Sequence, residues 1–172
     1  GLYLQLQMME MNASGEEQSR LSNVTRIINE SITKMRDLVW SIDARSDTWD
    51  KLLERMEDYA SDTLSPLDIR YSIHQPHALT RHIDTHRKHN VYLIFKEAIH
   101  NIAKHSNATV VDIRFEDKDG KLVMSIQDNG RKQDKSYAPG QGLNNMKMRA
   151  DRIKAELFTG FNESGYLVRC AF

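Results

Sequence analysis

Three short segments in the second half of the chain carry side chains suited to binding a nucleotide. The first lies on a predicted helix from Thr85 to His105, where Glu97 and Asn101 are four residues apart and so share a face. Lys104 and His105 follow one turn further on. Together a carboxylate, a carboxamide, an ammonium and an imidazole could bind a metal ion and phosphates. Taken alone, the same set could also be a solvated helix face.

The second segment, Gln127-Asp128-Asn129-Gly130, directly follows an alternating strand pattern. An acidic residue at a strand end, followed by glycine, places a carboxylate beside backbone that a ligand can approach closely. Such a carboxylate could accept a hydrogen bond from a purine amino group. By itself the tetrapeptide is only a turn signal.

The third segment, Pro139 to Met146, places glycines directly before a predicted helix. Free amide groups and the positive end of the helix dipole make such a helix start a natural phosphate site. Glycine before a helix is common, so the order and spacing of all three segments are more specific than any one of them.

The elements that must position these segments follow from hydrophobic periodicity. We predict helices over Trp49–Leu64 (capped by Asp47 or Thr48), Thr85–His105 and Leu143 to about Lys154, and strands over Ile69–Ile73, Thr109–Phe115, Lys121–Gln127, Ala155–Thr159 and Tyr166–Phe172. The sum is an α+β protein, a two-layer sandwich in which helices cover one face of an antiparallel sheet.

The first forty residues predict two helices broken near residues 12–15. In the second, one apolar stripe recurs at helical spacing through Leu21, Val24, Ile28, Met35 and Leu38. A hairpin of two amphipathic helices cannot bury the apolar residues of both helices within itself, so we expect a homodimeric four-helix bundle. The alternative is a hairpin packed on its own globular domain. We therefore assign residues 1–45 to a partial dimerisation hairpin and residues 46–172 to a second domain.

The amino-acid composition of the chain limits the classes of partner and the cellular compartment that we expect. Twenty-four basic and twenty-four acidic side chains cancel, so no broad positive field favours nucleic acid. The lone cysteine, Cys170, sits in an apolar strand pattern and suits a reducing, cytoplasmic setting. No apolar run is long enough to span a bilayer, so we expect any membrane anchor of a parent protein to lie in an N-terminal part outside these residues.

In their order and spacing, the three segments resemble the ATP-binding boxes of the GHKL family. Glu97–Ala108 is similar to the N box in sensor histidine kinases of the nitrate-sensor and lipid-desaturase-sensor type, Asp128–Gly130 to the G1 box, and Gly140–Ala150 to the G2 box. Residues 21–66 also resemble the second dimerisation helix and linker of such kinases, which are of the HisKA_3 type. The resemblance implies a GHKL (Bergerat) sandwich of the HATPase_c type.

The resemblance also implies a role for each site residue. Glu97 would be catalytic, orienting or polarising the attacking group, and Asn101 would coordinate Mg on the triphosphate. Asp128 would accept from the adenine amino group and Gly130 would let the base approach. The implied ATP-binding set is Asn101, Lys104, His105, Asp128, Gly130, Gly140, Gly142, Leu143 and Tyr166, with residues 131–141 as a lid over ATP.

The implied activity is that of a protein histidine kinase. With ATP and Mg as cofactors, it would pass the γ-phosphoryl group to a histidine and then to the receiver domain of a response regulator. No histidine precedes His74. We therefore expect the acceptor upstream of this chain and no autophosphorylation by the chain alone.

Two departures from the family pattern support an alternative. Lys132 stands where the G1 box has a second glycine, and Tyr166 stands where the family has a threonine. The chain could thus be a non-catalytic dimerisation and signalling module with a decayed nucleotide site. A serine kinase of the anti-sigma type would lack the hairpin and be a monomer. His82, His86 and His89 share helical spacing, but interleaved basic residues argue against a metal site there.

Overall fold

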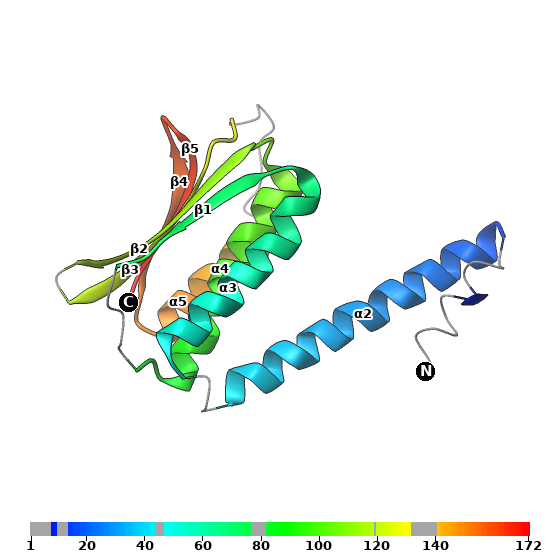
Figure 1. The fold of residues 1–172 in the computed structure, drawn as a ribbon, viewed down its shortest axis with the longest axis horizontal. Helices are drawn as coiled ribbons and strands as arrows, with labels where there is room; N and C mark the ends of the chain where they lie inside the picture. The colour runs from blue at the N-terminus through cyan, green and yellow to red at the C-terminus, as the bar shows by residue number, and fades with distance from the viewer. Residues whose placement is uncertain (1–7, 10–13, 44–46, 77–81, 119, 132–140) are drawn as a thin grey trace. The chain divides into compact units, whose positions relative to one another are not determined.

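The computed structural model describes residues 8–9, 14–43, 47–76, 82–118, 120–131 and 141–172 (Figure 1). The chain divides into two compact units, Gly1–Asp43 and Ala44–Phe172. Among the described residues, no helix combines the length and apolar character needed to cross a membrane.

The described part of the first unit is dominated by one long helix, α2 (Glu16–Ile42). It begins after Gly15, whose φ of 63° is in the left-handed region, and this start agrees with the predicted break at residues 12–15. Glu16 and Glu17 in the first turn complement the helix dipole. Most of the first predicted helix falls outside the described residues.

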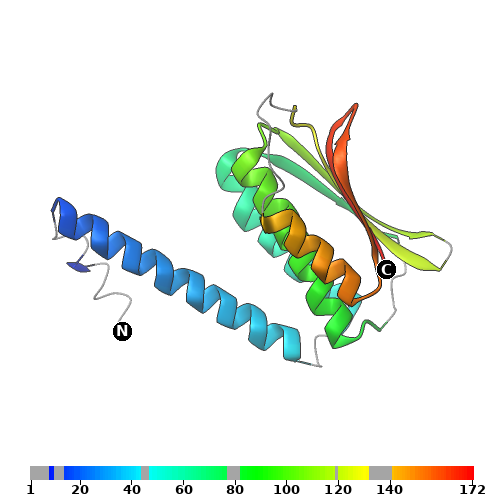
Figure 2. The same ribbon diagram turned by 180° about the vertical axis from the view of Figure 1, so that it is seen from behind.

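The second unit is a two-layer sandwich. Its elements are α3 (Trp49–Leu64), the 3-10 helix η2 (Ser65–Leu67), β1 (Arg70–His74), α4 (Thr85–His105), β2 (Val110–Lys118), β3 (Lys121–Asp128), α5 (Gln141–Arg152), β4 (Glu156–Asn162) and β5 (Gly165–Ala171). The three α-helices cover one face of the sheet in both views of the ribbon (Figures 1 and 2). The predicted fold class, a helical N-terminal part followed by an α/β sandwich, is confirmed.

The prediction of a purely antiparallel sheet is wrong. The strand order is β1-β2-β3-β5-β4, and β1 pairs with β2 in parallel, with Arg70 opposite Val110. The other three pairs are antiparallel. The physical reason is the connection: α4 lies between β1 and β2 in the chain, and a helical crossover returns the next strand in the same direction.

Two predicted boundaries also differ from the structure. Helix α5 begins at Gln141, not at Leu143, and ends at Arg152. Strands β4 and β5 extend across most of the predicted loop because the turn between them is short. Asn162 Oδ1 accepts from the backbone N–H groups of Ser164 and Gly165, at 2.9 and 3.1 Å, which satisfies that turn.

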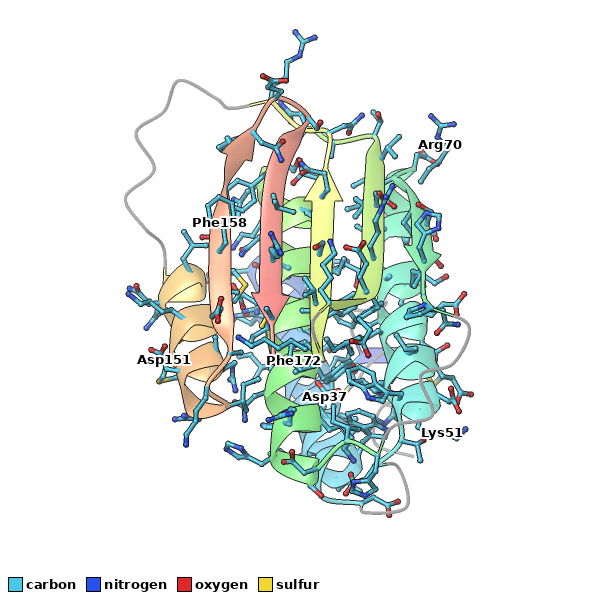
Figure 3. The ribbon with its side chains drawn as sticks, turned by 90° about the vertical axis from the view of Figure 1, so that its left-hand side faces the viewer. Asp37, Lys51, Arg70, Asp151, Phe158 and Phe172 are labelled. Atoms are coloured by element: carbon cyan, nitrogen blue, oxygen red, sulfur yellow. The ribbon has the colours of Figure 1, made fainter. Side chains whose placement is uncertain are left out.

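Side chains alternate between a buried and an open face of the sheet. The buried face carries Val111, Ile113, Phe115, Met124, Ile126, Val168 and Cys170. Figure 3 views the opposite, open face, with Phe158 of β4 and Arg70 of β1 at its two sides. Burial raises the pKa of the Cys170 thiol to about 12, so it behaves as the small apolar strand residue that the sequence predicts.

A buried ion pair ties the start of α3 to the start of α4. Lys88 Nζ lies 2.6 Å from Asp47 Oδ1, and both side chains are almost completely buried, with exposed fractions of 0% and 7%. The hydroxyl of Thr85 donates to the other carboxylate oxygen. Burial by itself raises the pKa of Asp47, but the Lys88 and Thr85 hydrogen bonds and the Lys88 charge outweigh it, so this pKa lies below its ordinary value.

We predict that Asp47→Ala lowers the free energy of unfolding by about 3–5 kcal/mol, because it removes the carboxylate that pairs with the buried charge of Lys88. The matched control is Glu54→Ala, which breaks an equally short ion pair with Lys51, at 2.6 Å, whose side chains are about 60% exposed. That control should cost less than about 1 kcal/mol. Urea unfolding followed by circular dichroism measures both, and equal losses would contradict the prediction.

The same variant has a defined pH dependence. A carboxyl with a lowered folded-state pKa adds stability above its unfolded pKa, which is about 3.9, and loses it as the pH falls through the folded-state pKa. The difference in unfolding free energy between the wild type and Asp47→Ala should therefore be constant near neutral pH and shrink below about pH 4. Urea titrations at a series of pH values measure it, and a difference that grows toward acid would contradict it.

Candidate functional site

Helix α4 supplies the first part of the candidate site. Asp84 caps its start by accepting from the Arg87 backbone N–H at 2.9 Å. One face is buried through Ile94, Ala98, Ile99 and Ile102. The predicted site residues lie on the other side: Glu97 and Asn101 are half-buried, and Lys104 and His105 are exposed in the last turn.

The start of α5 packs directly against this face. A Cβ added to Gly142 would overlap the carboxylate oxygen Oε1 of Glu97, lie 3.0 Å from its Cδ and lie 3.6 Å from Asn101 Nδ2. Only glycine lets the helix start come this close without displacing Glu97. The structure thus brings Glu97, Asn101 and Gly142 together, with Leu143 half-buried beside them. Gly140 and the lid residues 132–140 lie outside the described residues.

The second part of the site is centred on Asp128 at the end of β3. Its side chain is buried, with the residue 3% exposed. The oxygen Oδ1 accepts from the Gly130 backbone N–H at 2.7 Å and from the Ser106 hydroxyl at 3.2 Å. Since Ser106 directly follows α4, the helix that carries Asn101 also contacts the carboxylate predicted to bind adenine.

The residues on either side of Asp128 hold its backbone in place. Gln127 Nε2 donates to the carbonyls of Asp128 and Tyr166, at 2.9 and 3.1 Å. Asn129 Oδ1 accepts from the backbone N–H groups of Thr109 and Val110, at 2.8 and 3.0 Å. Sequence reasoning gave no role to Gln127, Asn129 or Ser106. The one sequence feature that could have indicated their roles is their position, beside Asp128 for Gln127 and Asn129 and at the end of α4 for Ser106.

Strand β5 begins next to the backbone of Asp128 and Asn129. Gly165 has a φ of 137°, and a Cβ there would collide with the carbonyl oxygen of Asp128 and lie 3.0 Å from the Cα of Asn129. Tyr166, opposite Phe161 of β4, packs edge to face against it with ring centroids 5.0 Å apart. By the alternation of β5, Tyr166 shares the helix-covered face with Val168 and Cys170.

Charge around Glu97 includes a cation from α5. Desolvation and the neighbouring Arg152 lower the pKa of the half-buried Arg149, while the charge of Glu97 acts in the opposite direction. Arg149 is two helical turns beyond Gly142 and hence on the same side of α5. A positive charge therefore lies within electrostatic range of the predicted catalytic carboxylate.

Other surfaces offer less chemistry. A shallow hollow on α5 is lined by Asn144, Lys147, Met148, Asp151 and Arg152, away from Asp128. Within the described ranges, no three His, Cys, Asp or Glu side chains gather to hold a metal. A Mg ion beside Asn101 would therefore take most of its ligands from phosphate oxygens and water, which is how proteins commonly hold Mg.

Comparison with known sequences finds a sensor histidine kinase and a sensor protein. No family model matches the chain. The chain is similar to the sensor histidine kinase LiaS of Bacillus subtilis, with 34% identity over 90 residues that cover 51% of this chain and 24% of LiaS. It is also similar to the sensor protein VraS of Staphylococcus aureus, with 40% identity over 68 residues, 38% of this chain and 20% of VraS. The matched part is thus about a quarter or less of these relatives.

Comparison with solved structures finds the same fold. The histidine kinase domain of the Erythrobacter litoralis EL346 blue-light activated kinase aligns with a TM-score of 0.61 at 16% identity, over 99% of this chain and 94% of that one. Acinetobacter baumannii AdeS gives 0.64 at 15% identity, over 99% and 90%. Full-length ShkA in complex with AMPPNP gives 0.64 at 13% identity, over 92% and 39%.

The second unit therefore has the fold of a histidine kinase catalytic domain of the GHKL type. The relatives found by sequence are a sensor histidine kinase and a sensor protein, and the structural neighbours are histidine kinases, so the predicted resemblance of this chain to sensor histidine kinases is confirmed.

We predict that Gly165→Ala destabilises the protein more than Gly120→Ala. Both glycines have positive φ, 137° and 78°, but a Cβ at Gly120 would meet nothing within 4 Å. Backbone strain should cost each variant on the order of 1–3 kcal/mol, and the collision with Asp128 should add about 1–3 kcal/mol at Gly165 only. Urea unfolding measures both losses. Equal losses would show that the Asp128 contact is unimportant.

Proposed function

We propose that this chain is the ATP- and Mg-binding catalytic portion of a two-component sensor histidine kinase. The observation that carries the proposal is the convergence on one helix of the three predicted boxes. Gly142 packs against Glu97 and Asn101 in the second half of α4, and Asp128 bonds to Ser106 at its end. A nucleotide lying along α4 would meet a carboxylate for its base at one end and a carboxamide for its metal at the other.

Each group has a distinct role in this proposal. Asp128 accepts from the adenine amino group, and Asn101 provides the protein ligand to Mg. Lys104, His105 and the amide groups at the start of α5 contact the phosphates, and Tyr166 borders the base. Bound Mg supplies charge neutralisation on the phosphate oxygens. That one structural neighbour, ShkA, was solved with AMPPNP supports a nucleotide in such a fold.

The reaction we propose is phosphoryl transfer to a histidine outside this chain. An imidazole nitrogen attacks the γ-phosphorus, the bond from that phosphorus to the bridging oxygen breaks, and ADP leaves. Glu97 orients the attacking imidazole and polarises it by accepting a hydrogen bond from its N–H. The phosphohistidine then gives its phosphoryl group to an aspartate of a response regulator. Such transfers depend mainly on positioning and charge, which the fixed Glu97 and Asp128 would provide.

The proposed partners follow from the same reading. Helix α2 exposes an apolar row, with Val24, Ile27, Met35, Leu38 and Val39 each at least 45% exposed. This row supports a homodimer through the helical hairpin. The other partner is a response regulator receiver domain, not nucleic acid. We place the chain in the cytoplasm, with any membrane anchor in an N-terminal part of the parent protein.

A non-catalytic module with a decayed nucleotide site is the second candidate. Lys132, which supports it, lies outside the described residues. Tyr166 also supports it, because its phenol packs against Phe161 where the family has a smaller residue. The intact convergence around Gly142 and Asp128 favours the catalytic candidate.

We predict that the chain binds a non-hydrolysable ATP analogue with Mg and that Asn101→Ala abolishes the Mg-dependent binding heat, because it removes the metal ligand. Calorimetry measures this, and circular dichroism should show an unchanged fold. The matched control is Asn23→Ala, an exposed helical asparagine of the other unit whose side chain bonds only to Arg26 among the hydrogen bonds described. No heat from the wild type at millimolar ligand would favour the decayed module, and unchanged binding by Asn101→Ala would mean a misplaced site.

We predict that the chain is a dimer in light scattering and that Met35→Glu converts it to a monomer by placing a charge in the apolar row. Met35 is 65% exposed in the single chain. Asn29→Asp, on another side of α2, adds a comparable charge outside the row and should leave the dimer intact. A wild-type monomer would contradict the proposed dimer.

A further inference from the structure

We propose that Ser106 is a positioning residue that sets the carboxylate of Asp128 for recognition of the adenine amino group. The inference rests on the proposed function, since it assigns Asp128 to the base. It goes further because it names a residue outside the predicted ATP-binding set and gives that residue a role in base selectivity.

The hydroxyl of Ser106 has only one arrangement that satisfies its two neighbours. The backbone N–H of Ala108 can only donate, and it reaches Ser106 Oγ at 3.1 Å. A carboxylate can only accept, and Asp128 Oδ1 lies 3.2 Å from the same oxygen. Ser106 therefore accepts from Ala108 and directs its single proton at Asp128.

The two donors that reach Asp128 both bond to the same oxygen. Oδ1 takes the Ser106 hydroxyl and the Gly130 backbone N–H, at 3.2 and 2.7 Å. Oδ2 takes part in neither bond. Two donors on one oxygen fix the rotation of the carboxylate, so that Oδ2 is the atom presented to a purine amino group.

Gly130 is part of the same arrangement. A Cβ there would overlap Ser106 Oγ, lie 2.8 Å from Asp128 Oδ1 and lie 3.4 Å from Ser106 Cβ. The sequence suggested that Gly130 lets the base approach. In the structure the space of its missing side chain is taken by the contact between Ser106 and Asp128, so this glycine is needed for that contact.

Ser106 also links the two ends of the site. Its backbone N–H donates to the Ile102 carbonyl at 3.0 Å, so it is the last residue held by α4, five positions after Asn101. The helix that carries the proposed metal ligand thereby fixes the base-binding carboxylate through one hydroxyl. Ser106 acts through Asp128 and is not itself a catalytic residue.

The test compares two ligands that differ only at the 6-amino group: non-hydrolysable triphosphate analogues of adenosine and of purine riboside, each with Mg. Calorimetry on the full chain gives the two dissociation constants. Ser106→Ala should weaken adenosine-analogue binding roughly tenfold, the scale of one hydrogen bond to a charged group, with little change for the purine riboside analogue. Ser106→Thr keeps the hydroxyl and should restore the wild-type ratio.

Ser72→Ala is the matched control. Ser72 Oγ donates to Asp112 at 3.2 Å, the same bond at the same length, between β1 and β2. It should change neither constant.

Each outcome has a separate meaning. A wild-type preference for adenosine that Ser106→Ala leaves intact overturns the role of Ser106 but not the proposed function. Equal losses for both ligands in Ser106→Ala indicate a merely structural role and also overturn it. A wild type that binds both ligands equally overturns the assignment of Asp128 to the amino group, and a wild type that binds neither overturns the proposed function with it.

Discussion

Close backbone approach at three glycines is the constraint on which the candidate site depends. Gly142 lets α5 begin against Glu97 and Asn101, Gly130 makes room for the contact between Ser106 and Asp128, and Gly165 lets β5 start against the Asp128 carbonyl. At each of these positions a Cβ would occupy space already filled by the chain's own atoms. The glycines therefore bring the start of α5 against α4 and hold the ends of β3 and β5 around Asp128, and a ligand that fits there would find groups already held in position.

Helix α4 connects that corner to the rest of the molecule. Near its first turn, Lys88 and Thr85 bind the buried carboxylate of Asp47. At its end, Ser106 binds the carboxylate of Asp128. Between these two polar contacts, its apolar face is buried in the core of the second unit. Polar contacts thus hold both ends of the helix, and Asn101 lies five residues before Ser106, which contacts Asp128.

The fold and the site residues differ in how strongly they support the proposed function. Histidine kinase catalytic domains share this fold with the chain at 16% identity or less in the structures compared, and a fold alone does not establish an activity. The proposed function instead depends on particular groups: a carboxylate held at the end of a strand, a carboxamide on a helix, and a helix start that a glycine brings against that helix. Their common location gives the motifs a physical meaning that each lacks when taken singly.

Local interactions determined what the sequence could predict. The cap at Thr48, the alternation of β2 and β3, and the span of α4 follow from contacts between residues a few positions apart. Tertiary structure alone decided the parallel pairing of β1 with β2, the earlier start of α5, the Asp47–Lys88 ion pair and the bond from Ser106 to Asp128. These depend on which distant segments meet, and in the last two cases a polar side chain is buried because its partner arrives from elsewhere in the chain. Periodicity and propensity describe one segment at a time, so they could indicate which residues carry chemistry but not which of them would touch.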